Sequence, residues 1–243
     1  MAEQLPLTLA LDEQARFENF YPGPNGELVE RLRGLAEGET GVLYLWGAPG
    51  SGRSHLLQAA CHHCSVRGGA SLCLDLSSPG EWAPELLDGL EGLDLVCLDE
   101  SWRLAGKADW ERALFHLYNR CRERGTPLVI SGDAAPAHSA FQLPDLRSRL
   151  GWDWVYRLQP LSDADKAEAL VYLAALRGLD LPKETAHYLL RRCPRDMATL
   201  RHLLRALDTA SLASRRALTI PFVNAFLARN PRWQTQAGLF DAL

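Results

Sequence analysis

The chain has 243 residues, of which 47% are hydrophobic and 23% are charged. This composition excludes a largely disordered chain, and no apolar run reaches the ~18 residues of a membrane-spanning helix. The net charge of −4 argues against a protein whose whole surface binds nucleic acid. The N-terminus lacks the basic and apolar regions of a secretory signal, so we expect a reducing, cytoplasmic setting.

The first part of the chain alternates short apolar runs with segments of helical spacing, up to Pro160. This alternation predicts buried parallel strands with helices on both faces of the sheet. The expected strands are 41–46, 70–75, 93–99, 126–131 and 154–158. The expected helices are 25–37, before the first strand, and 52–66, 84–90 and 108–124, between later strands.

After Pro160 only helical patterns follow, and Ser162 and Asp165 have the spacing of a capping box. The expected helices of this part are 163–176, 182–192, 195–210 and 219–229. The fold class is therefore α/β: a three-layer core with a parallel five-stranded sheet, followed by a small all-helical lid. We expect an N-terminal arm over 1–16, the core over 17–160, the lid over 161–230 and a tail over 231–243.

Charge is distributed unevenly between these parts. Residues 162–243 contain 12 Lys and Arg against 8 Asp and Glu, whereas residues 1–161 contain 14 against 22. Two interpretations stay open: chance variation between two solvated surfaces, or a basic lobe turned toward phosphate.

A glycine-rich segment follows the first strand. Gly47-Ala-Pro-Gly-Ser-Gly-Arg-Ser54 matches the phosphate-loop pattern G-x-x-x-x-G-K-[ST], except that Arg53 replaces lysine. Glycines let backbone N–H groups surround a phosphate, and the helix N-terminus adds partial positive charge. A guanidinium is wider than an ammonium, so we expect nucleotide binding with a preference for a diphosphate and poor intrinsic hydrolysis. The candidate nucleotide-binding residues here are Gly47, Pro49, Gly50, Ser51, Gly52, Arg53, Ser54 and His55.

Two acids end the third strand, Asp99 and Glu100. In phosphate-loop ATPases, the first such acid holds Mg²⁺ together with the loop hydroxyl, and the second can position water. We therefore expect Asp99 and Ser54 to hold Mg²⁺ and Glu100 to position water. Glu100 favours hydrolysis whereas Arg53 argues against it, and the sequence leaves both open. Phe17 and Phe20 could flank an adenine or belong to the core.

Several motifs together carry a resemblance to a known family. They are the phosphate loop with arginine, the Leu95–Asp99 strand, Leu117–Arg120, Ile130–Asp133, Leu143–Leu150 and Leu158–Asp163. In these the chain resembles the Hda family, DnaA-related regulatory inactivators of the bacterial replication initiator. The resemblance extends from the arm to Val223.

The resemblance implies an AAA+ fold and a regulatory function. Bound to ADP (with ATP possible) and tethered to the DNA polymerase sliding clamp, such a protein stimulates hydrolysis of the ATP held by DnaA. It implies that Arg149 acts as an arginine finger in trans, with Arg147 as the alternative, and that Asp133 occupies the first sensor position. It also implies cytoplasmic, nucleoid-associated localisation and contact with DNA mainly through the clamp complex, and it leaves a homo-oligomer open.

The arm contains the candidate clamp-binding residues Gln4, Leu5, Leu7 and Leu9. Pro6 favours an extended backbone before it, and alternate leucines of a strand share one face. The alternative is a strand that packs on its own domain. Gln236–Phe240 matches a looser clamp pattern. In the lid, Ala198 stands where the family places a nucleotide-contacting arginine, so Arg195 or Arg201 is the expected substitute.

Two other functions compete with the regulatory one. An autonomous AAA+ ATPase of the helicase-loader type is expected to keep the loop lysine and to lack the arm motif. A DNA-binding initiator would need a further helix-turn-helix domain, for which the segment after the lid is too short.

Overall fold

The computed structural model describes residues 15–78, 82–214 and 216–234. The chain divides into two compact units, 1–159 and 160–243, which are treated separately below. Within the described residues, no helix is both long enough and apolar enough to cross a membrane.

The first unit is built on a parallel sheet of five strands in the order β2-β3-β4-β1-β5. The strands are β1 (Val42–Trp46), β2 (Ser71–Asp75), β3 (Leu95–Asp99), β4 (Leu128–Gly132) and β5 (Trp154–Arg157). All five lie within two residues of their expected bounds. The helices are α1 (Gly26–Ala36), α2 (Arg53–Val66), α3 (Ala108–Arg124) and α4 (Pro144–Leu150).

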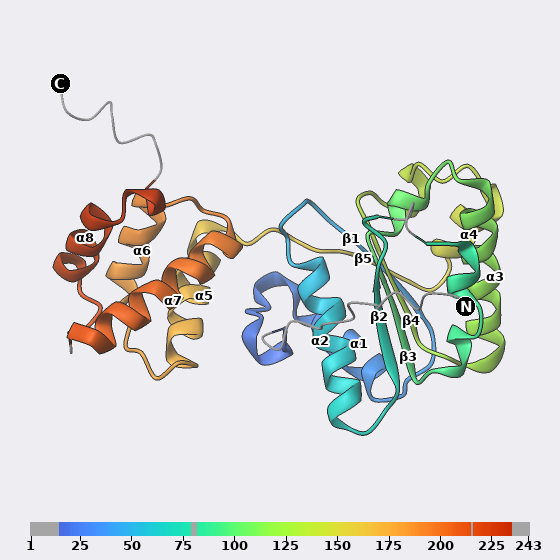
Figure 1. The fold of residues 1–243 in the computed structure, drawn as a ribbon, viewed down its shortest axis with the longest axis horizontal. Coiled ribbons are helices and arrows are strands. Elements are labelled where there is room, and N and C mark those ends of the chain that lie inside the picture. The colour runs from blue at the N-terminus through green and yellow to red at the C-terminus, as the bar shows by residue number, and fades with distance from the viewer. Residues whose placement is uncertain (1–14, 79–81, 215, 235–243) are drawn as a thin grey trace, which may run out of the picture. The chain divides into compact units, whose positions relative to one another are not determined.

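The helices cover both faces of the sheet, as the alternating pattern predicts (Figure 1). Alternate residues of the central strands enter different cores, because successive side chains of a strand point to opposite faces. Leu43 and Leu45 of β1 pack with α1 and α2. Val42 and Tyr44 of the same strand pack on the other side with α3 and α4. The α/β three-layer prediction is confirmed.

One local prediction for this unit is wrong, and one helix is missed. The segment 84–90 forms two short 3-10 helices, Pro84–Leu87 and Leu90–Gly92, rather than one helix. Gly89, between them, has a φ of 79°, a left-handed conformation that interrupts helical hydrogen bonding. The helix α4 is not predicted, since its seven residues are too few to show a periodic pattern.

The second unit contains α5 (Asp163–Ala175), α6 (Lys183–Arg192), α7 (Met197–Ser214) and α8 (Ile220–Arg229). The capping box is confirmed: Ser162 Oγ accepts from Asp165 N at 3.1 Å, and Asp165 Oδ2 accepts from Ser162 N at 3.0 Å. Apolar faces of the four helices share one core that includes Leu170, Leu189 and Leu203. This unit is the small helical lid that the sequence predicts.

Candidate functional site

The phosphate loop joins the carboxyl end of β1 to the N-terminus of α2. Gly50 and Gly52 have φ values of 73° and 106°, which side-chain-bearing residues rarely adopt. Nothing lies within 4 Å of a Cβ built on Gly50, so the loop is open at that point. Ser51 Oγ is shielded from solvent and has no hydrogen-bond partner among the described residues. The loop therefore offers an unused hydroxyl next to the N-terminus of a 14-residue helix.

Arg53 is the first residue of α2, and it is only 6% exposed. Its Nη1 donates to the carbonyl of Gly47 and, at 2.8 Å, to the carbonyl of Gly132. Its guanidinium carbon lies 4.5 Å from the centre of the Trp102 ring. Within the described residues it has no carboxylate partner. A buried cation without an anion is costly, so this residue fits a site that binds an anion such as phosphate.

Asp99 lies at the carboxyl end of β3 and is 5% exposed. Its Oδ1 accepts from the Ser131 hydroxyl at 2.6 Å and from the Glu100 backbone N–H at 2.9 Å. Both described bonds use the same oxygen, so Oδ2 is left for a further ligand. Ser131 belongs to β4, and the sequence analysis misses it. A hydroxyl inside an otherwise apolar strand is the signal that could have indicated it.

Glu100 adopts a left-handed backbone with a φ of 57°, which is uncommon for a residue with a side chain. Its carboxylate accepts from Arg103 Nε at 3.2 Å, and its side chain is 25% exposed. The structure thus places Glu100 beside Asp99 but pairs it with an arginine. Its role in positioning water stays a prediction.

The other predicted residues of the loop lie around α2. Ser54 is exposed in the first turn of the helix. The His55 ring nitrogen lies 3.0 Å from the Arg16 carbonyl, and the ring stacks on Phe20 with centroids 5.8 Å apart. A Cβ on Gly52 would approach the Phe20 ring to 3.0 Å. Of the two aromatic candidates, Phe20 therefore lies beside the loop.

Phe17 is part of the core instead. It is 3% exposed, contacts the His63 ring edge-on and lies beneath the Arg33 guanidinium. The interpretation of Phe17 as a core residue, which the sequence left open, agrees with this placement.

Asp133 follows β4 directly and is exposed at the carboxyl edge of the sheet. Tyr44, from the neighbouring strand, lies beneath this edge and donates from its hydroxyl to the Ala134 carbonyl at 3.1 Å. Burial raises the pKa of Tyr44, and the negative charge of Asp133 raises it further. The tyrosine is therefore neutral at physiological pH and supports the end of β4 through packing and this hydrogen bond.

Gly132→Ala is expected to destabilise the first unit by about 3 kcal/mol or more, because overpacking of a close contact is costly. A Cβ on Gly132 would lie 1.9 Å from the Tyr44 hydroxyl oxygen and 2.4 Å from the ring carbon that carries it. Urea unfolding followed by circular dichroism measures the change. Gly151→Ala is the control, since its nearest neighbour would be 3.5 Å away. Equal stability of both variants would contradict the expectation.

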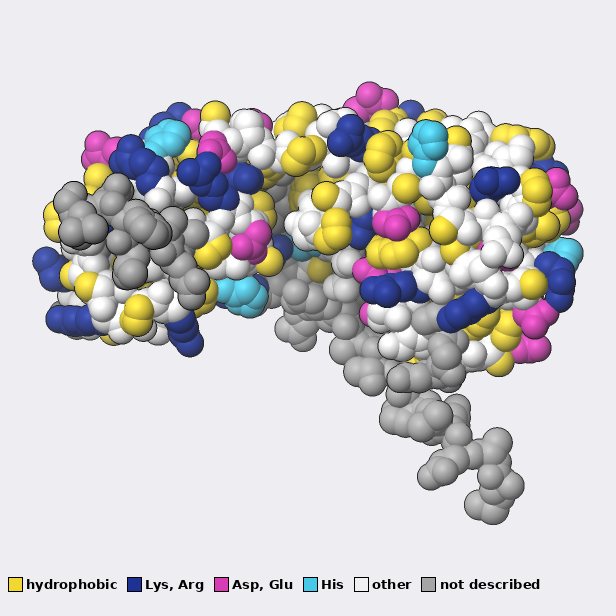
Figure 2. Space-filling view, turned by 90° about the horizontal axis from the view of Figure 1, so that it is seen from above, with side chains coloured by type: hydrophobic (Ala, Val, Ile, Leu, Met, Phe, Trp, Pro, Cys, Tyr) yellow, Lys and Arg dark blue, Asp and Glu magenta, His cyan; other side chains and the backbone are white. Residues whose placement is uncertain are grey.

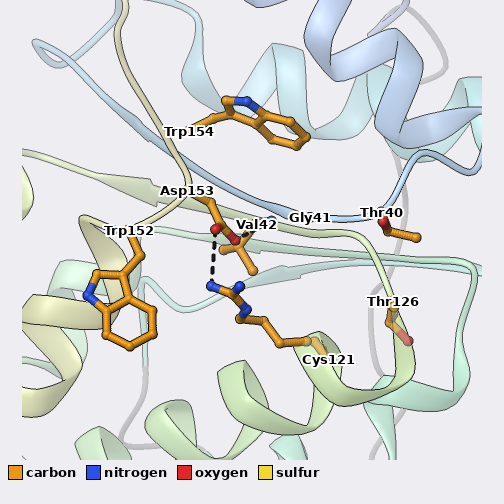
Figure 3. A pocket seen from close by; sticks show the side chains of 10 residues that line it. Thr40, Gly41, Val42, Cys121, Thr126, Trp152, Asp153 and Trp154 are labelled. Carbon is orange, nitrogen blue, oxygen red and sulfur yellow. Dashed lines mark hydrogen bonds and ion pairs between the residues drawn. The ribbon is translucent and has the colours of Figure 1, made fainter.

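Arg149 lies near the C-terminus of α4, far from the loop of its own chain. Its guanidinium carbon is 3.9 Å from the centre of the Trp152 ring. Trp152 precedes β5 and lines a pocket of about 440 Å³ at the amino edge of the sheet, with the residues drawn in Figure 3. The loop follows the carboxyl end of β1. At ~3.3 Å per residue, a five-residue strand separates the two edges by roughly 15 Å.

Several side-chain contacts connect the residues at the amino edge of the sheet. Asp153 accepts from the Val42 backbone N–H at 3.2 Å and from Arg122 at 3.1 Å, the pair drawn with a dashed line in Figure 3. The Arg122 guanidinium carbon is 5.7 Å from the Trp152 ring, on which Arg149 also stacks. Trp152 is 55% exposed, so the ring presents Arg149 at the surface.

Arg149 has no carboxylate partner among the described residues. The same is true, within those residues, of the alternative finger Arg147, which is half-buried on α4. What distinguishes Arg149 is the ring of Trp152 against its guanidinium. Trp152 was not predicted, and the sequence signal for it is only a tryptophan three residues after Arg149.

In the lid, Ala198 is exposed in the first turn of α7. Arg195 donates to Asp163 at 2.7 Å and to the Leu190 carbonyl at 3.1 Å. Arg195 and Asp163 line a small pocket of about 150 Å³, together with His187, Leu190 and Arg191. Arg195 is thus committed to contacts inside the lid. Lys and Arg side chains are visible on the lid surface in Figure 2. Arg191 and Arg192 of α6 are exposed.

The candidate clamp-binding residues Gln4, Leu5, Leu7 and Leu9 lie outside the described residues, as does Gln236–Phe240. Their clamp contacts stay predictions from the sequence.

Several solved structures share the fold of this chain at low sequence identity. The chain is 20% identical to domain III of the Thermotoga maritima replication initiation protein DnaA, covering 93% of this chain and 99% of that one with a TM-score of 0.72. It is 22% identical to AMPPCP-bound DnaA from Aquifex aeolicus, covering 74% and 61% with a TM-score of 0.63. It is 16% identical to the Thermotoga maritima RuvB Holliday junction branch migration motor, covering 88% of this chain and 73% of that one with a TM-score of 0.60. The fold is that of an AAA+ protein with a helical lid.

The lid identifies the type more narrowly. Residues 163–227 match the family model described as the lid domain of Hda. The chain therefore carries an Hda lid on a DnaA-like AAA+ fold, and the resemblance to the Hda family is confirmed.

Proposed function

We propose that this protein is a regulatory adaptor that, bound to ADP and tethered to the sliding clamp, stimulates ATP hydrolysis by DnaA and so prevents re-initiation of replication. The observation that carries the proposal is the position of Arg149. This cation has no anion partner in the described chain, is stacked on an exposed ring, and lies at the sheet edge opposite to the loop of its own chain. Such an arginine is suited to a nucleotide held by another protein.

Features of the loop itself support nucleotide binding. The buried Arg53, the orphaned hydroxyl of Ser51 and the left-handed Gly50 and Gly52 fit a phosphate group. We propose that these residues hold ADP and that Asp99 and Ser54 hold Mg²⁺. When bound, Mg²⁺ would neutralise charge on the phosphates. The chain's own contribution is to enclose the phosphates with N–H groups and a guanidinium.

The match to the Hda lid supports a proposal for partners and setting. We propose DnaA and the clamp as partners, contact with DNA mainly through the clamp, and a cytoplasmic, nucleoid-associated location. A homo-oligomer would bring Arg149 of one copy to the loop of another, so DnaA and a second copy compete for the same edge.

An autonomous ATPase is the second candidate, because Glu100 lies beside Asp99 at the site. The Glu100–Arg103 pair argues against it, since the arginine engages one of the two carboxylate oxygens and draws the side chain toward itself. Phosphate release by the chain alone, compared between wild type and Glu100→Gln, separates the candidates. Turnover of the wild type that is lost in Glu100→Gln would support the motor, and absence of turnover supports the adaptor.

Arg53→Ala is expected to weaken ADP binding about 10- to 100-fold, because a charge-assisted hydrogen bond to phosphate contributes about 1.5–3 kcal/mol. Titration of a fluorescent ADP analogue measures the affinity. Arg157→Ala, which removes an exposed arginine over Trp46, is the matched control. ADP affinity unchanged by Arg53→Ala would contradict the assignment of this residue.

The adaptor proposal is tested by measuring hydrolysis of DnaA-bound ATP in the presence of this protein and clamp loaded on DNA. Faster conversion of ATP to ADP on DnaA supports it. An unchanged rate on DnaA would overturn it.

A further inference from the structure

Trp102 is not part of the phosphate-loop pattern, yet it contacts the loop arginine. It belongs to the 3-10 helix Ser101–Leu104, which follows β3 and the two acids at the end of that strand. Its ring is half-buried and lies against the Arg53 guanidinium, with 4.5 Å between the guanidinium carbon and the ring centre. Two segments far apart in the sequence thus meet at the site.

The Arg53 guanidinium is held at a defined place. Its Nη1 bonds to the carbonyl oxygens of Gly47 and Gly132, which follow β1 and end β4 respectively. These strands are neighbours, with Trp46 paired to Gly132 in register. The guanidinium therefore lies across the carboxyl ends of two strands. The guanidinium carbon also lies over the Trp102 ring, so the ring limits movement of the guanidinium in that direction, while its N–H groups point outward in the guanidinium plane.

This placement matters for the length of the phosphate chain. The loop N–H groups and the start of α2 surround the phosphate nearest to them. A longer phosphate chain must extend toward the strand ends, where the guanidinium lies. A lysine could move aside on its slim stem, but a planar cation fixed by two carbonyls and a ring resists displacement.

We propose that Trp102 is a positioning residue that holds Arg53 across the ends of β1 and β4, and thereby makes the loop favour a nucleoside diphosphate over a triphosphate. This inference rests on nucleotide binding at the loop, as proposed above. It adds the residue that sets the preference.

The test compares the dissociation constants of ADP and ATP for full-length wild type, Trp102→Leu and Trp102→Phe, measured by calorimetry with Mg²⁺ present. Loss of the cation–π contact is expected to lower the ratio of the ATP constant to the ADP constant about tenfold in Trp102→Leu. Trp102→Phe keeps an aromatic face and is expected to stay within about threefold of wild type. Arg53→Lys is expected to lower the ratio as well, and adding Trp102→Leu to it should change little further.

Trp154→Leu is the matched control. It removes another arginine–tryptophan stack of the same unit, in which Arg31 lies 4.3 Å from the ring centre at the opposite edge of the sheet. The nucleotide ratio should stay at the wild-type value in this variant.

Several results would overturn the inference. They are an unchanged ratio in Trp102→Leu, an equal loss of both affinities, or a Phe variant that behaves like the Leu variant. If Trp102→Leu does not fold, an unchanged ratio in Arg53→Lys overturns it equally. A wild type that binds ADP and ATP alike defeats this inference but not the adaptor function. A wild type that binds neither defeats both this inference and the ADP-bound form of the proposed adaptor.

Discussion

Arg149→Ala is expected to reduce the stimulated hydrolysis of DnaA-bound ATP by at least about 10³-fold, the lower end of what an arginine finger contributes. The guanidinium lies at the edge opposite to its own loop and has no carboxylate partner in the described chain, so its charge is available to a partner's phosphates. Single-turnover hydrolysis on DnaA, with clamp loaded on DNA, measures the rate at saturating concentration of this protein. The concentration for half-maximal effect should change little, because the residue acts on the reacting phosphate rather than on docking.

Three further variants test this expectation more closely. Arg147→Ala changes a neighbouring arginine of the same short helix and should leave the rate within about threefold, because it leaves the finger itself intact. Trp152→Ala should lower the rate at saturation by about tenfold through loss of the stack on Arg149, whereas Trp152→Phe should retain most of it. If Arg147→Ala lowers the rate about 10³-fold and Arg149→Ala keeps the wild-type rate, the finger is Arg147 and the assignment to Arg149 is wrong.

Replacing Leu5 and Leu7 together by alanine is expected to weaken clamp binding by at least about 100-fold. Burial of each leucine contributes about 1.5–3 kcal/mol, so loss of both removes most of the affinity of a short peptide. Surface plasmon resonance with immobilised clamp measures the change. Deletion of residues 236–243 serves as the comparison: a loss smaller than about threefold would leave the arm as the main contact.

The fold could be predicted where one residue pattern dominates. Five apolar runs and the capping box at Ser162 define strands and helices that the structure reproduces. The order β2-β3-β4-β1-β5 was not predictable from these runs. Buried parallel strands are apolar on both faces, so their sequences do not indicate which strands pair. The helix α4, which carries Arg149, was not predicted because it has only seven residues.

In the candidate site, too, contiguous motifs could be predicted and contacts between distant residues could not. The glycines and Arg53 are contiguous, so their pattern indicated a phosphate loop without any knowledge of the fold. Ser131, Trp102 and Trp152 act through contacts with Asp99, Arg53 and Arg149, and the first two of these pairs join residues 32 and 49 positions apart. Only the folded chain brings such pairs together. The placement of Arg149 at the edge opposite to the loop likewise depends on the direction of β1 and β5.

The central claim is that this protein acts on a nucleotide held by DnaA. It is tested most directly by loading DnaA with radiolabelled ATP and this protein with unlabelled ADP, then mixing them with clamp loaded on DNA. We expect labelled ADP on DnaA, formed only when this protein is present and has Arg149. Persistence of labelled ATP on DnaA, at the level seen without this protein, would overturn the proposed function.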